Sequence, residues 1–474
     1  MDRLQKLVQK QRNFTAIASK SFDDPRLAGQ MLGQIRNVID GMEPRQAVSL
    51  LRDLADEHRK RSQFDLVEST YSELVRRYPT EPGSFDAMRW LIQFWCSSET
   101  AWQRTRAMTS DSSIQQTKAN QPAQFLQQTV DDAILGDDGV QQAVVSNDSG
   151  NVVSNSKTSS PMRLNAKLDF DEKRSTGKKP SKQGRLKIEQ DVDWRTGAVA
   201  DWHTRAAEMA KQLEVLKPDI YRSAEIQFPL AAMRRNRGAP RAADAIMRTF
   251  MSSAIDSDTK QLAERELWAS YETVETPQAY SVCRRTTTRP YLDGLLSDPC
   301  WEAANEILLV SSDSNDASQS PKSLVMFSYD DNFLYLALSF SRAEGTPREA
   351  PQMKGRKHDD DVSRNDRLTF RLDIDRDYAT WYEFQIDQRG KTTDSCWEDR
   401  RWNPQWSVAA ESDQNTWRIE AAIPWNELVA NPPQRGSFYA VSLLRTIPMV
   451  GIQSWTQPAT NQPRPSSFGL LKLE

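Results

Sequence analysis

Apolar positions recur with the spacing of an α-helix over residues 1–106 and again over residues 196–279. In each block they return every three or four residues, which places them on one face of a helix. Gly41, Pro44 and Pro79 separate the runs in the first block and mark where one helix ends and the next begins. We therefore predict amphipathic helices joined by short turns, which pack as antiparallel hairpins.

From about residue 280 the hydrophobic period changes to two, which is the period of a β-strand. The alternating runs are FLYLALSF (Phe333–Phe340), LTFRLDID (Leu368–Asp375), WYEFQID (Trp381–Asp387) and FYAVSLL (Phe438–Leu444). Turn residues such as Asn332 and Gly390 lie between them. Many short strands with no long helix between them predict an antiparallel β-sandwich over residues 280–474.

Between the helical blocks, residues 107–195 show neither period. Polar residues dominate, as in VVSNDSGNVVSNSKTSS, and aromatic residues are almost absent. Such a segment buries too little apolar surface to offset the entropy of ordering the chain. We predict a disordered linker here, between a helical domain at 1–106 and a helical segment at 196–279. The sequence leaves open whether the two helical blocks form one domain or two.

The charge of the chain narrows the partners that we expect. Its 474 residues carry a formal net charge of −3, which gives no general attraction to nucleic acid or anionic lipid. The basic stretch Arg174–Lys187 contains no aromatic residues to stack on bases. The sequence contains no run of 18 apolar residues, which is the length that a membrane-spanning helix needs. The N-terminus lacks the apolar core of a signal peptide. We expect a cytoplasmic protein if the given start is the native one and an exported protein if the N-terminus is truncated.

Alternation along two strands predicts one apolar and one polar face. The apolar face takes Leu368, Phe370, Leu372 and Ile374 from the first strand and Tyr382, Phe384 and Ile386 from the second. The polar face takes Thr369, Arg371 and Asp373 from the first strand and Trp381, Glu383 and Gln385 from the second. If the strands are neighbours, the polar face is either a ligand-binding surface or a solvated pair of charges, Arg371 with Glu383.

The segment LADEHRKRSQFDLVESTYSELVRRYPTEP resembles a tetratricopeptide repeat, with two short helices, an aromatic residue in the second and a closing proline. Ser62 stands at the turn, where that family usually has glycine. Ala231–Phe250 resembles a second copy, with Gly238 at its turn. The resemblance implies a helical scaffold that binds a protein partner. A generic helical bundle is the alternative.

The strand region contains a succession of motifs: LDGLLSDPCWEAA, SLVMFSYDDNFLYLALSF, NDRLTFRLDID, WYEFQIDQRG, WRIEAAIPWNEL, SWTQP and SSFGLLKL. In this order they resemble the family 9 carbohydrate-binding modules and the wider DOMON-like superfamily. The resemblance implies a β-sandwich that binds a glycan or polysaccharide without catalysis and accompanies polysaccharide degradation. It places Thr369 and Gln385 near positions that contact sugar, and Arg445 at the end of a strand that reaches the same cleft.

The resemblance breaks down at the sugar clamp. Sugar-binding members hold the ring between two tryptophans, and the corresponding segments here, Asp359–Arg364 and Thr460–Pro465, contain no aromatic residue. Either the site is rebuilt from Trp381, Trp397 or Trp402, whose rings can stack on a pyranose, or sugar binding has been lost. The second case would leave a structural or interaction protein.

The sequence gives little support for an enzyme or a cofactor. The four cysteines form no CxxC pair, and the three histidines cannot be assembled into a catalytic triad. Carboxylates are too numerous to single out the pair that glycoside hydrolysis needs. The run Asp373, Asp375 and Asp377 is not an EF-hand loop, because Tyr378 occupies the glycine position. We predict no cofactor, with a structural calcium ion on this run as the alternative.

Overall fold

The computed structural model describes residues 39–119, 199–252, 256–273, 275–311, 320–347, 349–352 and 359–474, together with Ile35 and Asn37. For residues 109–119 it describes the backbone alone. Residues 107–119 of the predicted linker belong to a helix that begins at Ser98, so the linker prediction is wrong there, and the rest of the linker lies outside the described residues. No helix among the described residues combines the length and the apolar character that crossing a membrane requires.

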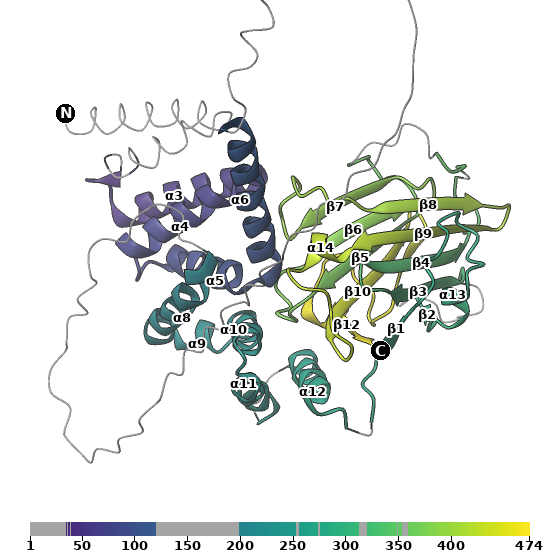
Figure 1. The fold of residues 1–474 in the computed structure, drawn as a ribbon. Coiled ribbons are helices and arrows are strands. Elements are labelled where there is room, and N and C mark those ends of the chain that lie inside the picture. The colour runs from purple at the N-terminus through teal and green to yellow at the C-terminus, as the bar shows by residue number, and fades with distance from the viewer. Residues whose placement is uncertain are drawn as a thin grey trace, which may run out of the picture. The chain divides into compact units, whose positions relative to one another are not determined.

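Helices occupy the first part of the described chain and strands the second (Figure 1). The helices are α3 (Pro44–Lys60), α4 (Phe64–Arg77), α5 (Pro82–Cys96), α6 (Ser98–Ala119), α8 (Val199–Leu216), α9 (Pro218–Tyr221), α10 (Ala224–Asn236), α11 (Pro240–Ser252) and α12 (Ser257–Tyr271). Prolines stand at the first helical positions of α3, α5 and α9, where the missing N–H has no intrahelical partner to lose.

The turn between α3 and α4 explains one departure from the tetratricopeptide pattern. Ser62 adopts a φ of +56°, in the left-handed region that favours glycine. Gly238, at the corresponding turn of the second segment, has a φ of +75°. Ser62 also accepts a hydrogen bond at its Oγ from the Arg400 backbone N–H, 3.2 Å away, which glycine could not do. Whether these hairpins are tetratricopeptide repeats stays a prediction.

The two helical blocks share one hydrophobic core. Side chains of α3, α4 and α5 belong to the same buried cluster as those of α8, α10 and α11. Within that cluster the rings of Phe94 and Trp202 lie 4.7 Å apart between centroids. The residues between the blocks therefore interrupt the sequence of the helical part but not its core.

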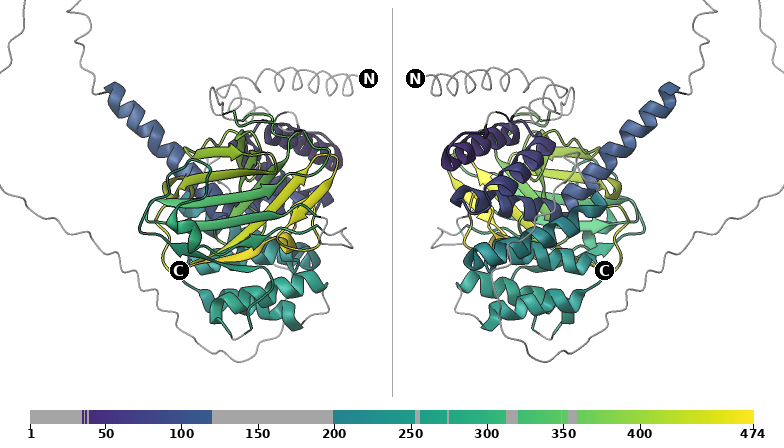
Figure 2. Two further views of the ribbon diagram at one scale, coloured as in Figure 1. Left: turned by 90° about the vertical axis from the view of Figure 1, so that its right-hand side faces the viewer. Right: turned by 90° about the vertical axis from the view of Figure 1, so that its left-hand side faces the viewer.

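The strands form a single curled sheet of mixed direction (Figures 1 and 2). They are β1 (Tyr280–Arg285), β2 (Ile307–Leu308), β3 (Ser323–Tyr329), β4 (Phe333–Ser341), β5 (Arg367–Asp373), β6 (Tyr382–Asp387), β7 (Thr392–Cys396), β8 (Ser407–Ser412), β9 (Thr416–Pro424), β10 (Phe438–Ile447), β11 (Gly451–Ser454) and β12 (Gly469–Leu473). Three short helical segments accompany them: α13 (Pro299–Glu302), α14 (Trp425–Leu428) and η1 (Pro465–Ser467).

The order across the sheet is β7-β6-β5-β10-β12-β1-β3-β4-β9-β8, with β11 beside β10 and β2 beside β3. All described pairs are antiparallel except those of β1, which runs parallel to both β12 and β3 and so joins the two halves. The halves face each other across a core, where Phe327 of β3 and Phe370 of β5 lie 5.3 Å apart. The strand pairing therefore joins the two halves through β1, and the antiparallel β-sandwich stays a prediction.

The predicted apolar face of β5 and β6 is confirmed except at Ile374, which follows β5 and is half-buried. Phe370 pairs with Phe384 in register, and Leu368, Phe370, Leu372, Tyr382, Phe384 and Ile386 are all at most 1% exposed. The opposite face differs from the prediction, because Thr369 and Arg371 are also buried. They lie on β5, which β6 and β10 flank on both sides, whereas β6 lies next to the sheet edge at β7.

Side chains of the helices contact the sheet at several points. Arg59 of α3 donates to Glu398 at 2.6 Å, and Gln103 of α6 donates to the Tyr382 hydroxyl at 3.0 Å. Glu266 of α12 accepts from Arg376 at 3.1 Å. These polar contacts join segments that lie far apart in the sequence.

Candidate functional site

A polar hollow of about 400 Å³ lies over β6 and β7. It is lined by Asp360, Asp361, Val362, Ser363, Arg367, Glu383, Gln385, Thr393, Asp394, Ser395 and Arg400. Two predicted site residues, Glu383 and Gln385, therefore come together here. Since no aromatic ring belongs to this lining, the hollow has no surface on which a pyranose could stack.

The polar groups of this face largely satisfy one another. The Arg371 Nε donates to one oxygen of Glu383 at 2.6 Å, and the Gln385 amide donates to the other at 2.8 Å. Thr369 pairs with Gln385 in register but does not line the hollow. The predicted pair of Arg371 and Glu383 is thus a cross-strand ion pair, which favours its structural interpretation.

Asp394 lies in the wall of the polar hollow and carries a perturbed carboxyl group. Burial raises the pKa of Asp394 from 3.8 to about 7, against the lowering effect of the hydrogen bond that the Trp406 indole donates at 3.1 Å. Its Oδ1 has no hydrogen-bond partner among the described residues. The protonated form is therefore favoured in the fold.

We expect Asp394 to make stability fall as the pH rises. The pKa of Asp394 is higher in the folded state than in the unfolded state. Its contribution to the stability of the fold is therefore complete below about pH 4 and is lost as the pH rises through about 7. At about pH 8, Asp394→Asn should be more stable than the wild type by roughly 1–2 kcal/mol. Urea unfolding at several pH values measures this, and Asp361→Asn, on an exposed carboxylate of the same hollow, is the control. An equal decline in wild type and Asp394→Asn would contradict the prediction.

Arg445 does not line the polar hollow, and its burial argues against the predicted contact with sugar. It is fully buried on β10 and forms two hydrogen bonds with Asp366, at 2.9 and 2.6 Å. It also donates to the Ser323 hydroxyl at 2.7 Å and lies over the Phe340 ring, 4.7 Å from its centroid. These contacts use the guanidinium inside the sheet, where no ligand has access.

Trp381 is half-buried, and its ring packs at 5.6 Å from the ring of Phe468. Phe468 belongs to the buried cluster of the helical part. The sequence pattern placed Trp381 on an open sheet face, but the helices cover it. Its ring therefore packs between the helices and the sheet and does not line the polar hollow.

Trp397 and Trp402 line a larger cavity of about 630 Å³, which we call the aromatic cavity. Its wall consists of Phe64, Asp65, Phe94, Thr100, Gln103, Arg104, Arg106, Ala107, Trp202, Cys396, Trp397, Asp399, Arg401, Trp402, Asn403 and Glu427. Helices α4, α5, α6 and α8 supply one side and the loop after β7 supplies the other. Its volume is within the range of small-molecule sites.

The rings of the aromatic cavity are fixed by their neighbours. Trp402 packs at 4.6 Å against Tyr382 and is 7% exposed. Trp397 is half-buried and lies 5.3 Å from Trp90 and 6.0 Å from Phe64. Neither ring is therefore the open loop platform that the sequence suggested. Both rings instead belong to the wall of a half-open cavity.

Two indole groups in this wall have no hydrogen-bond partner. The Nε1 atoms of Trp202 and Trp402 are buried and unpaired among the described residues. The indole of Trp90, outside this wall, is also unpaired, whereas Trp301 donates to Glu420 at 2.7 Å and Trp417 donates to Asp366 at 3.1 Å. An unpaired buried N–H costs free energy unless a ligand or water accepts from it.

Charged side chains complete the wall as ion pairs. Arg104 pairs with Asp65, Arg106 with Glu427, and Arg401 with Asp399. Each pair keeps one carboxylate and one guanidinium at the cavity, and such groups accept from and donate to sugar hydroxyls. The cavity thus combines aromatic surface with fixed polar groups.

The helical side of this cavity was not predicted from sequence. Phe64, Phe94 and Trp202 read as core positions of amphipathic helices, which they also are. Gln103 and Arg106 lie with Glu99 on one face of α6, at positions i, i+4 and i+7, and all three contact the strand region. This polar stripe on α6 was a local signal that the helix contacts another part of the protein. It did not show which part.

The cysteines do not supply a nucleophile. All four are buried and unbonded. Burial raises the pKa of Cys300 to about 12 and the pKa values of Cys96, Cys283 and Cys396 well above the ordinary range. A thiol in such surroundings stays protonated and is inert.

No protein-family model matches the chain, and no curated protein matches it. Among solved structures, it is similar to a family 9 carbohydrate-binding module from Caldicellulosiruptor kristjanssonii in complex with cellotriose. The identity is 15% and the TM-score 0.31, over 41% of this chain and 93% of that one. The family 9 module from the same organism in complex with glucose matches at 15% identity and a TM-score of 0.31, over 41% and 96%. Similarity at this level does not assign a function, so the function has to be inferred from the residues of this chain.

Proposed function

We propose that this protein binds a carbohydrate in the aromatic cavity and does not act on it chemically. The observation that carries the proposal is the pair of buried, unpaired indole N–H groups of Trp202 and Trp402 in a wall of aromatic rings. A sugar offers hydroxyl oxygens as acceptors for such donors and C–H faces for the rings.

The polar part of the wall favours the same class of ligand. Asn403 and the ion pair of Arg401 with Asp399 lie beside the rings, so that donors and acceptors alternate with apolar surface. The order of motifs in the strand region supports a carbohydrate-binding-like sandwich, in which β1 joins two sheets that face each other. The helices, on this interpretation, form half of the sugar site and leave their outer faces for a protein partner.

Binding should be tested on the full chain with a glycan array, followed by calorimetric titration of each glycan that binds. Trp402→Phe and Trp202→Phe each remove one N–H and keep an aromatic ring. We expect each to weaken binding about 2- to 12-fold, which corresponds to one hydrogen bond of about 0.5–1.5 kcal/mol. The control is Trp301→Phe, which removes a buried N–H that is paired with Glu420 outside the cavity.

Two results would contradict the proposal. One is a folded chain that binds no glycan across plant, algal and bacterial sets. The other is an equal loss of affinity in Trp402→Phe and Trp301→Phe, because a general loss of structure would then explain both. Thermal unfolding of each variant is the accompanying measurement of folding.

A second candidate is a structural or interaction protein that has lost sugar binding. It is favoured by the packing of Trp397 against Trp90, which uses that ring to join helix α5 to the loop after β7. On this hypothesis Trp402→Phe leaves every partner interaction unchanged and raises stability slightly, since it removes an unpaired donor. A silent glycan array together with such a stability gain would favour this second candidate.

A further inference from the structure

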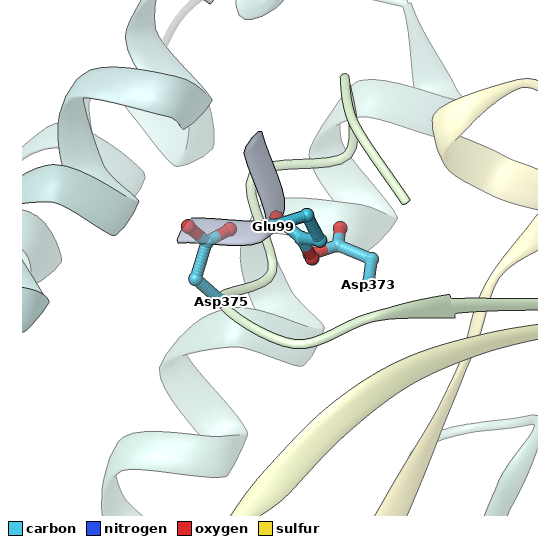
Figure 3. A group of neighbouring side chains, drawn as sticks. All are labelled: Glu99, Asp373 and Asp375. Atoms are coloured by element: carbon cyan, nitrogen blue, oxygen red, sulfur yellow. The ribbon is translucent and has the colours of Figure 1, made fainter. Parts of the chain in front are cut away.

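Four carboxyl groups are buried together where β5 ends against the start of α6. Glu99 and Asp373 are 0% exposed, Asp377 is 1% exposed and Asp375 is 7% exposed. Oxygen atoms of Glu99, Asp373 and Asp375 all lie within 4.8 Å of one another. Figure 3 shows these three side chains, with Glu99 reaching from the helix to the two aspartates of the strand end. We call the four residues the carboxylate cluster.

The carboxylate cluster has no cationic side chain in its interior. Among the described ion pairs, none includes any of its four members, and the nearby Arg376 and Arg235 both pair with Glu266 instead. Several negative charges cannot be buried together unless they bind protons or a cation.

The oxygens are held in place by backbone donors. The Ile374 N–H donates to Glu99 at 2.7 Å, and the Tyr378 N–H donates to Asp373 at 2.7 Å. The Ser98 N–H donates to Oδ2 of Asp375 at 2.8 Å. The other oxygen of that carboxylate, Oδ1, is buried and has no partner among the described residues. The cluster therefore contains a buried carboxyl oxygen without a partner among the described residues, beside two further carboxyl groups.

We propose that the carboxylate cluster binds a divalent metal ion of the calcium type, with Glu99, Asp373 and Asp375 as ligands. All three donors are oxygen atoms, which hard cations prefer over nitrogen or sulfur. Calcium–oxygen distances of about 2.3–2.6 Å allow ligand oxygens on opposite sides of the ion to lie about 5 Å apart. The observed separations fit within that limit.

This site would differ from a metal site within the strand region alone. Glu99 belongs to α6, Asp373 is the last residue of β5, and Asp375 lies in the loop that follows. A cation bound to all three joins the helical part to the sheet. Because binding to the folded state alone stabilises that state, the bound ion should raise the melting temperature of the whole described unit.

The test uses the full chain after treatment with a chelator. Calcium chloride should raise the melting temperature of the wild type, and terbium luminescence excited through tryptophan should report binding that calcium displaces. Asp375→Asn keeps the size of the side chain and removes its charge. We expect it to weaken calcium binding by at least about tenfold, since even outer-shell partners of metal ligands are worth roughly 10- to 100-fold. Asp53→Asn, at an exposed position of α3, should change nothing.

Three outcomes would overturn the proposal. The first is a wild type whose melting temperature and terbium signal do not respond to the cation. The second is equal calcium affinity in the wild type and Asp375→Asn, which would indicate surface binding. The third is stabilisation by Asp375→Asn and Glu99→Gln with no cation bound to the wild type, which would mean that protons neutralise the cluster. If the variants do not fold, the proposal is tested on the wild type alone, by titration with calcium and by measuring its metal content with mass spectrometry.

Discussion

Replacing Arg445 with methionine should lower the free energy of unfolding by about 3–5 kcal/mol. The substitution leaves Asp366 as a buried charge, 3% exposed in its side chain, without its guanidinium partner. It also leaves Ser323 and the Ser341 carbonyl without the donors that Arg445 supplies. Breaking one partner of a buried pair is costly because the remaining charge has no water to replace the lost contact.

Urea unfolding measures the loss at Arg445, and Arg418→Met provides the matched control. Arg418 lies on β9 and pairs with Asp413 at 2.8 Å, but its partner is 50% exposed. An exposed pair of this kind contributes about 0–1 kcal/mol. If the two variants cost the same, Arg445 is not part of a buried network, and its sugar-binding role would be open again.

Replacing Phe370 with alanine should cost about 3–5 kcal/mol of unfolding free energy. The ring is fully buried between the rings of Phe384, at 5.7 Å, and Phe327, at 5.3 Å. Its removal leaves a cavity where the two halves of the curled sheet meet, and the surrounding strands can collapse only partly. The change therefore loses both the transfer free energy of the ring and its packing contacts.

Leu308→Ala is the control for Phe370, since Leu308 is a strand residue that is 59% exposed. Its truncation should change stability by no more than about 0.5 kcal/mol. Urea unfolding of both variants gives the comparison. A cost below about 1 kcal/mol for Phe370→Ala would mean that β5 presents its other face to the core, and the strand register would be wrong.

The strand assignments from Phe333 to Leu444 agree with the structure to within a few residues, because the period of two is a local property. Each apolar residue in those runs had to face away from water whichever strand lay beside it. The same reasoning predicted the helices of both blocks from their spacing. The positive φ at Ser62 is a comparable local effect, since a tight turn between two helices requires a left-handed residue.

The sequence predicted which residues form the polar face of β5 and β6, but it did not predict how exposed those residues are. Alternation places Arg371 and Glu383 on the same side of two strands, and the structure pairs them. The alternation alone does not show whether helices or further strands cover that side of the sheet. Arg371 is buried because β5 is an inner strand, and the strand order depends on pairing with β10, which lies much later in the chain.

The candidate sites depended still more on distant parts of the chain. Trp402 became a cavity residue because helices α5 and α8 bring Phe94 and Trp202 opposite it. The predicted linker separates these two helical residues in the sequence, and no motif connects them. The same holds for Glu99, which reads as an ordinary helix-start residue until it is found beside Asp373.

The amino-acid sequence by itself therefore determined the helices, the strands and the buried face of each, because periodicity and turn chemistry act over a few residues. Only the tertiary structure decided which polar side chains are enclosed, which tryptophans line a cavity and which carboxylates meet. Those outcomes depend on contacts between residues hundreds of positions apart, such as Glu99 with Ile374 and Arg59 with Glu398. Local sequence patterns predict that such side chains need partners, but the tertiary fold determines which residues those partners are.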